Sequence, residues 1–130
     1  MKKTRIIVDT SIWIDYFKYE KNVEFIENGL MNEKIFVVGP VVSELLQGVK
    51  TEKEYNKLIN CIEAIPFIDT SFKDWKKAGT ISYKLRRRGL TIPLTDIIIS
   101  AIALNNQVFI YSKDEHFKKV PEVNLYSPED

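Results

Sequence analysis

The chain has 130 residues, of which 45% are hydrophobic, and this suits one globular domain with one core rather than a disordered protein. Its 19 basic and 18 acidic residues leave a net charge of +1, so charge alone neither requires nor excludes a nucleic-acid partner. Cys61 and His116 are the only residues of their types, which excludes an ordinary zinc site and an internal disulfide. We expect residues 1–130 to form a single domain.

The N-terminal segment begins with basic residues and then turns apolar. Asp9 and Asp15 interrupt the apolar run, which is too short for a signal peptide or a membrane span. The lone cysteine fits a reducing compartment. We therefore expect a cytoplasmic protein with no membrane partner.

Hydrophobic periodicity predicts strands that alternate with helices, which favours an α/β fold with a mainly parallel sheet. Thr10 or Ser11 is expected to cap the first helix, and Pro40 suits the first turn of the third. Gly89 stands where a C-terminal helix cap belongs. The strands are expected over residues 4–8, 35–38, 66–68, 107–111 and 123–126, and the helices over 10–18, 23–31, 39–49, 52–64, 71–88, 93–105 and 115–118.

Four carboxylates carry the functional signal. Asp9 and Asp114 each follow a predicted strand, and in open α/β sheets ligands bind beyond the carboxyl ends of the strands. Asp96 lies in a helix whose apolar side chains cover nearly the whole circumference, so that helix is predicted to be buried. Glu44 borders the apolar face of its helix, and Gly48 one turn later leaves room for a neighbouring element or an ion.

Each acid alone also has an ordinary structural explanation. Asp9 could cap a helix, Asp96 could complement a helix dipole, Asp114 could start a short turn, and Glu44 could be a solvated flank residue. Together, however, clustered carboxylates repel one another unless a cation lies among them. Oxygen ligands of this kind favour Mg²⁺ or Mn²⁺.

At these acids the sequence resembles PIN-domain ribonucleases, and specifically the VapC-type toxins of toxin–antitoxin pairs. The matching stretches are VDTSIWID at 8–15, SELLQG at 43–48, IPLTD at 92–96 and YSKDEHF at 111–117. Their order and spacing agree over nearly the whole chain. The resemblance implies a three-layer α/β/α sandwich with a mainly parallel central sheet.

The resemblance also implies a site and an activity. The acidic pocket that binds Mg²⁺ or Mn²⁺ would consist of Asp9, Glu44, Asp96 and Asp114. The hydroxyl groups that support these ligands would come from Ser11, Thr95 and Ser112. The protein would then be an endoribonuclease toxin that hydrolyses phosphodiester bonds of tRNA or another structured RNA, would be neutralised by a cognate antitoxin, and would form a homodimer.

A basic cluster precedes Gly89, and it has two interpretations. It could hold RNA phosphates, or it could complement the dipole at the C-terminal end of its helix. The cluster consists of Lys84, Arg86, Arg87 and Arg88.

The same residues also fit other functions. Four acids do not distinguish RNA from DNA, so a metal-dependent DNA nuclease is an alternative. A catalytically silent PIN-like nucleic-acid-binding module is another, although this chain retains all four acids. An aspartyl-phosphate phosphatase or a phospho-receiver domain fits poorly, because Asp9 has no acidic neighbour near the end of its strand.

Overall fold

Four parallel strands form the sheet, in the order β3-β2-β1-β4. The computed structural model describes residues 4–128; residues 1–3 and 129–130 of the expected single domain lie outside it. Ile6 pairs with Ile35 on one side and with Phe109 on the other, so β1 is flanked on both edges and all three of its residues are buried. The strands are β1 (Ile6–Val8), β2 (Ile35–Val38), β3 (Phe67–Ile68) and β4 (Phe109–Tyr111).

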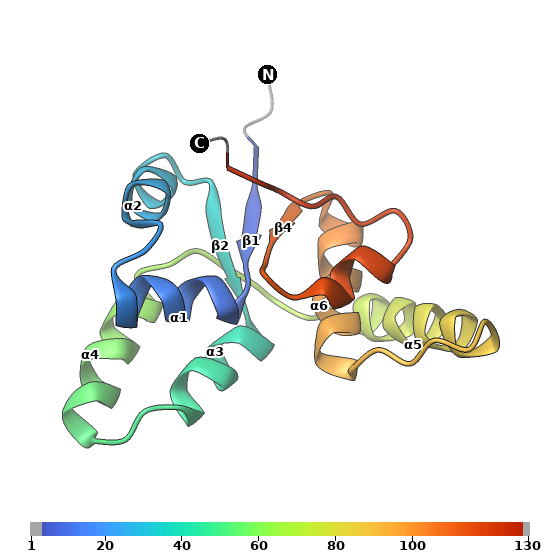
Figure 1. Ribbon diagram of the computed structural model, residues 1–130, viewed down its shortest axis with the longest axis horizontal. Coiled ribbons are helices and arrows are strands. Elements are labelled where there is room, and N and C mark those ends of the chain that lie inside the picture. The colour runs from blue at the N-terminus through green and yellow to red at the C-terminus, as the bar shows by residue number, and fades with distance from the viewer. Residues whose placement is uncertain (1–3, 129–130) are drawn as a thin grey trace.

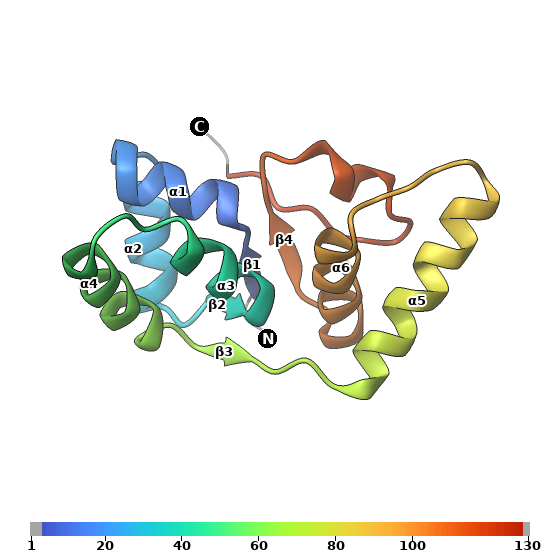
Figure 2. The ribbon, with the colours of Figure 1, turned by 90° about the horizontal axis from the view of Figure 1, so that it is seen from below.

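Helices cover both sides of the strands. Figures 1 and 2 show α1 to α4 gathered on one side, and α5, α6 and the short helix η1 on the other, which confirms the expected α/β layers. Among the helices of residues 4–128, none has the length and apolarity needed to cross a bilayer. The helices are α1 (Thr10–Tyr19), α2 (Val23–Met31), α3 (Gly39–Gln47), α4 (Glu52–Glu63), α5 (Phe72–Arg87), α6 (Leu94–Asn106) and the 3₁₀ helix η1 (Glu115–Lys119).

Helix α6 is the most buried helix of the fold, as its composition predicts. Every residue from Ile97 to Ala103 is buried, and the helix packs against α5, β4 and η1. Arg5, just before β1, donates a hydrogen bond to the Asn106 carbonyl at 2.6 Å, which places a cation at the negative end of the helix dipole. This burial gives α6, and therefore its first turn, a fixed position beside the sheet.

Apart from helix and strand ends that shift by one or two residues, the fold differs from the sequence prediction at two places. Asp9, rather than Thr10 or Ser11, occupies the N-cap position of α1. The edge strand expected over 123–126 forms only one parallel bridge, between Ile110 and Leu125. Glu122 has a φ of 71°, so a turn precedes this segment, and Leu125 at the bridge is 40% exposed.

The register of β1 and β4 determines where the candidate site forms. Val8 pairs with Tyr111, the last residue of each strand, and the Asp9 N–H donates to the Tyr111 carbonyl at 2.9 Å. Because the strands are parallel, the residues that follow them leave the sheet at the same edge. Asp9 and the segment 112–116 are therefore neighbours, although about a hundred residues separate them in sequence.

Candidate metal site

Asp9 is held by serine hydroxyls at the end of β1. Its side chain is 6% exposed, and within the described part of the chain it makes no capping bond to α1. Instead its Oδ2 accepts hydrogen bonds from Ser112 Oγ at 2.7 Å and from Ser11 Oγ at 3.3 Å. The capping interpretation therefore does not explain this carboxylate, whose orientation is set by two hydroxyl groups from opposite ends of the chain.

The same two serines connect the start of α1 to the loop after β4. Ser112 Oγ accepts a hydrogen bond from the Asp114 N–H at 2.9 Å, and Ser11 Oγ accepts one from the Lys113 N–H at 3.1 Å. Lys113 in turn forms an ion pair of 2.7 Å with the buried Asp15 of α1. These contacts place Asp114 next to Asp9 through a shared hydroxyl.

Asp96 and Asp114 converge on His116. Asp96 lies in the first turn of α6, and its Oδ2 is 2.7 Å from His116 Nδ1. The same nitrogen is 3.0 Å from Asp114 Oδ1, which also accepts the His116 backbone N–H at 2.9 Å. Among residues 4–128, these three form the one group of potential metal ligands whose donor atoms all lie within 4.8 Å of one another.

Burial and like charge act together on Asp96. Burial raises the pKa of this carboxyl, whose side chain is only 13% exposed. The negative charges of Asp114 and Asp9 raise the pKa further, whereas the hydrogen bond with His116 lowers it. A partly buried carboxylate near two others is an arrangement that a divalent cation would stabilise.

Glu44 stands beside the site without joining this group of ligand atoms. It is half-buried on α3, and its Oε1 accepts a hydrogen bond from Thr10 Oγ1 at 2.8 Å. Thr10 directly follows Asp9, so this hydrogen bond holds Glu44 of α3 against the start of α1, next to Asp9. Thr95 is half-buried next to Asp96 at the start of α6.

Two residues of the site were missed by sequence reasoning. The sequence assigns His116 no role at the site, and it predicts Thr10 only as a helix cap. A signal for His116 was present, because it stands two residues after Asp114 in a stretch already matched to the family. Thr10 carries no comparable signal, since its contact with Glu44 depends on how α1 packs against α3.

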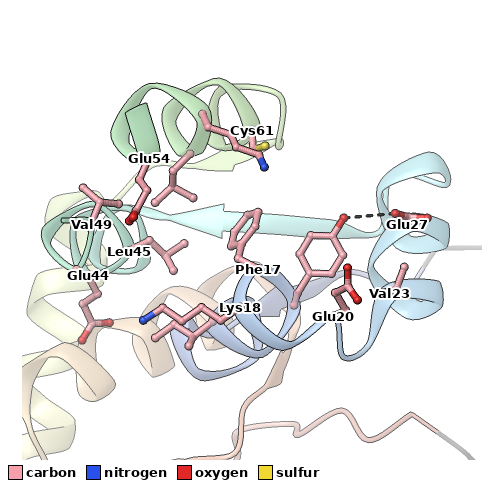
Figure 3. Close-up of a pocket in the computed structure, with 15 residues that line it drawn as sticks. Phe17, Lys18, Glu20, Val23, Glu27, Glu44, Leu45, Val49, Glu54 and Cys61 are labelled. Atoms are coloured by element: carbon pink, nitrogen blue, oxygen red, sulfur yellow. Dashed lines mark hydrogen bonds between the residues drawn. The ribbon is translucent and has the colours of Figure 1, made fainter. Parts of the chain in front are cut away.

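A large groove opens beside Glu44. Helices α1 to α4 enclose about 940 Å³, and the lining includes Ile14, Phe17 and Leu58. Figure 3 shows Phe17 and Leu45 directed toward the space between the helices. Phe17 is 37% exposed and stacks on the buried Trp13 at 5.7 Å between ring centroids.

Three of the four residues in the basic cluster of α5 lie in two different surroundings. Arg87 lies over the ring of Tyr83, with its guanidinium carbon 5.5 Å from the ring centroid. Lys84 and Arg88 instead line a smaller pocket of about 200 Å³ together with Lys77, a cation outside the predicted cluster. All four residues of the cluster are exposed.

Comparisons with known proteins agree with this architecture. Ribonuclease VapC11 of Mycobacterium tuberculosis is 25% identical over 124 residues, which cover 91% of this chain and 92% of the relative. Ribonuclease VapC1 of Methanocaldococcus jannaschii is 26% identical over 125 residues, with 95% and 87% covered.

Solved structures show the same fold at low sequence identity. A chain of VapBC2 from Rickettsia felis, bound to promoter DNA, matches with a TM-score of 0.84 at 21% identity, covering 97% of this chain and all of that one. A chain of DNA-bound VapBC from Salmonella typhimurium matches with a TM-score of 0.82 at 16% identity, covering 95% and 98%. The sequence model of the PIN domain family matches residues 6–123 of this chain. Since this match spans most of the 130 residues, the chain belongs to the PIN-domain family.

Proposed function

We propose that the protein is a VapC-type toxin, a metal-dependent endoribonuclease that hydrolyses RNA phosphodiester bonds. The observation that carries the proposal is the grouping of Asp96 and Asp114 beside Asp9, at the shared carboxyl ends of β1 and β4. The relatives named Ribonuclease VapC11 and VapC1 support the activity, because they match more than nine-tenths of this chain.

The residues of the site fit a divalent cation. Asp96 and Asp114 would hold Mg²⁺ or Mn²⁺, and Asp9 would contribute a further carboxylate oriented by Ser112 and Ser11. A bound divalent ion supplies a Lewis acid that activates water and neutralises charge on the scissile phosphate. Glu44, fixed by its hydrogen bond from Thr10, would orient the attacking water or add a ligand. Water attacks phosphorus in line, and the bond to the 3′ oxygen breaks, leaving a 3′-hydroxyl and a 5′-phosphate.

The substrate is proposed to be a tRNA or another structured RNA. A similar solved structure is that of VapC20 from Mycobacterium tuberculosis, described as a toxin that cleaves the sarcin–ricin loop. A DNA nuclease remains the alternative, because the carboxylates act on the phosphodiester and do not read the sugar. The homodimer that the family resemblance implies stays a prediction.

We assign the groove between α1 and α4 to the antitoxin, since several of the similar structures are toxin–antitoxin complexes. The charged residues that line the groove are four glutamates and two lysines, so the groove is negatively charged. This charge favours an antitoxin segment that is apolar and carries arginine. Because Glu44 also lines the groove, such an occupant would reach the edge of the candidate site. The charged lining residues are Glu20, Glu27, Glu44, Glu54, Lys18 and Lys57.

The first test compares the purified protein with its Asp9→Asn form on total RNA, with Mg²⁺ or Mn²⁺ and with a chelator. We expect Asp9→Asn to cleave about 100-fold more slowly. This corresponds to a loss of about 3 kcal/mol of the stabilisation that the metal gives to the transition state. Chelator should abolish cleavage, and Asp69→Asn, which changes an exposed acid outside the proposed ligands, should cleave normally. Equal activity of Asp9→Asn would remove Asp9 from the site, and cleavage of DNA alone would favour the DNA nuclease.

The second test uses the raised pKa of Asp96. A carboxyl whose pKa is raised in the folded state lowers the free energy of unfolding at pH values above that raised pKa. This loss of stability disappears at pH values below the ordinary aspartate pKa of about 3.9, because the carboxyl is then protonated in both the folded and the unfolded state. In chelator near neutral pH, Asp96→Asn should therefore raise the free energy of unfolding by about 1 kcal/mol. Urea titrations should show this gain shrinking as the pH falls toward about 4. A less stable Asp96→Asn protein at neutral pH would contradict the expectation, and Asp69→Asn should show no change.

The third test concerns RNA contacts of α5. Lys84 and Arg88 line the same pocket, so we expect the double change Lys84→Ala and Arg88→Ala to remove two phosphate contacts. In the Asp9→Asn background, the slope of log affinity against log salt should then fall by about 1.4. Changing the exposed Lys50 and Lys53 to alanine alters net charge equally and should leave the slope unchanged. An unchanged slope for the α5 variant would favour the helix-dipole interpretation.

The fourth test addresses the groove with one probe, the protein encoded by the adjacent reading frame. Aromatic anchors in a groove carry a large share of binding energy, so Phe17→Ala should weaken binding at least about tenfold in calorimetry. Tyr83→Ala removes an aromatic side chain on α5 that is 60% exposed, and it should bind normally. Unaltered binding by a folded Phe17→Ala protein would place the antitoxin elsewhere.

A further inference from the structure

His116 is the side chain that joins Asp96 to Asp114. Its Nδ1 is 2.7 Å from one carboxylate and 3.0 Å from the other, and its side chain is 39% exposed. Helix η1 fixes the backbone at this residue, because the backbone N–H of His116 is bound to Asp114 and the next residue, Phe117, is 1% exposed. The imidazole nitrogen is therefore held in place from both sides.

The spacing of the three atoms matches that of neighbouring ligands around one ion. In octahedral coordination at 2.0–2.1 Å, adjacent ligand atoms are roughly 3.0 Å apart. The two distances from His116 Nδ1 are close to this value, and all three donor atoms lie within 4.8 Å of one another. One cation could therefore take the place of the proton that the nitrogen shares with these carboxylates, with little movement of the side chains.

We propose that His116 Nδ1 is itself a ligand of the divalent cation, beside Asp96 and Asp114, and that the site therefore selects Mn²⁺ over Mg²⁺. The inference rests on the proposed metal-dependent function and specifies its ion. Imidazole is a good ligand for first-row transition metals, whereas Mg²⁺ prefers oxygen ligands. A site with one nitrogen donor among its carboxylates therefore binds Mn²⁺ more tightly than a site of carboxylates alone.

His116 has one competing role, that of a counter-cation that pairs with the two carboxylates and leaves when metal binds. The two roles predict opposite effects of removing the ring. Removal of a ligand weakens Mn²⁺ binding, whereas removal of a competing cation strengthens the binding of Mn²⁺ and Mg²⁺ alike.

The experiment measures Mn²⁺ and Mg²⁺ binding by calorimetry, with untagged protein at a fixed pH well above the ordinary histidine pKa of about 6.5. We expect His116→Ala to weaken Mn²⁺ binding at least about tenfold and Mg²⁺ binding by much less. His116→Asn keeps a hydrogen-bond donor and should also lose Mn²⁺ preference. Lys118→Ala, an exposed change in the same short helix, is the matched control and should bind both ions normally.

Pulsed electron paramagnetic resonance of bound Mn²⁺ gives a second readout. His116 is the only histidine of the chain, so any coupling to a directly bound imidazole nitrogen comes from this residue. We expect this coupling in the unaltered protein and its loss in His116→Asn. Absence of the coupling in the unaltered protein overturns the proposal, even where a variant fails to fold.

Asp96→Asn separates this proposal from the proposed function. Unchanged Mn²⁺ binding by Asp96→Asn would remove the metal site and, with it, the metal-dependent activity. If Asp96→Asn loses Mn²⁺ while His116→Ala binds it as tightly as the unaltered protein or more tightly, the metal site remains and only the role of His116 is wrong.

Discussion

The parallel pairing of β1 with β4 is the contact on which the candidate site depends. Val8 and Tyr111 are partners at the ends of these strands, and the next residue on each side already belongs to the hydrogen-bond network of Asp9 and Ser112. A slip of one residue in this register would turn side chains to the opposite face of the sheet. The acids would then no longer meet, so the precision of the site comes from the buried core of the sheet.

The acidic residues near this edge are supported by groups of different chemistry. Two hydroxyls bind Asp9, an imidazole lies against Asp96, and Lys113 pairs with Asp15. Neutral donors orient a carboxylate without cancelling its charge, whereas an ion pair neutralises it. The charge of Asp9 therefore stays available to a cation. The charge of Asp15 is instead paired with Lys113, and this ion pair connects α1 to the loop after β4.

Much of the architecture follows from the sequence, and the reasons are physical. Apolar runs ending in Asp9 and near Asp114 predicted parallel strands with acids at their carboxyl ends, and the apolar circumference around Asp96 predicted a buried helix. The single bridge at Leu125 could not be predicted, because edge pairing depends on the path of the preceding turn. The position of His116 could not either, since the contact with Asp96 joins two segments whose approach is set by packing of α6 against η1.

The hydrogen bond between Ser112 and Asp9 spans 103 positions of the sequence. Asp9 is translated early, whereas Ser112, one of the two serines that bind its carboxylate, is translated about a hundred residues later. A nascent chain that does not yet include Ser112 and Asp114 therefore lacks part of the acidic centre.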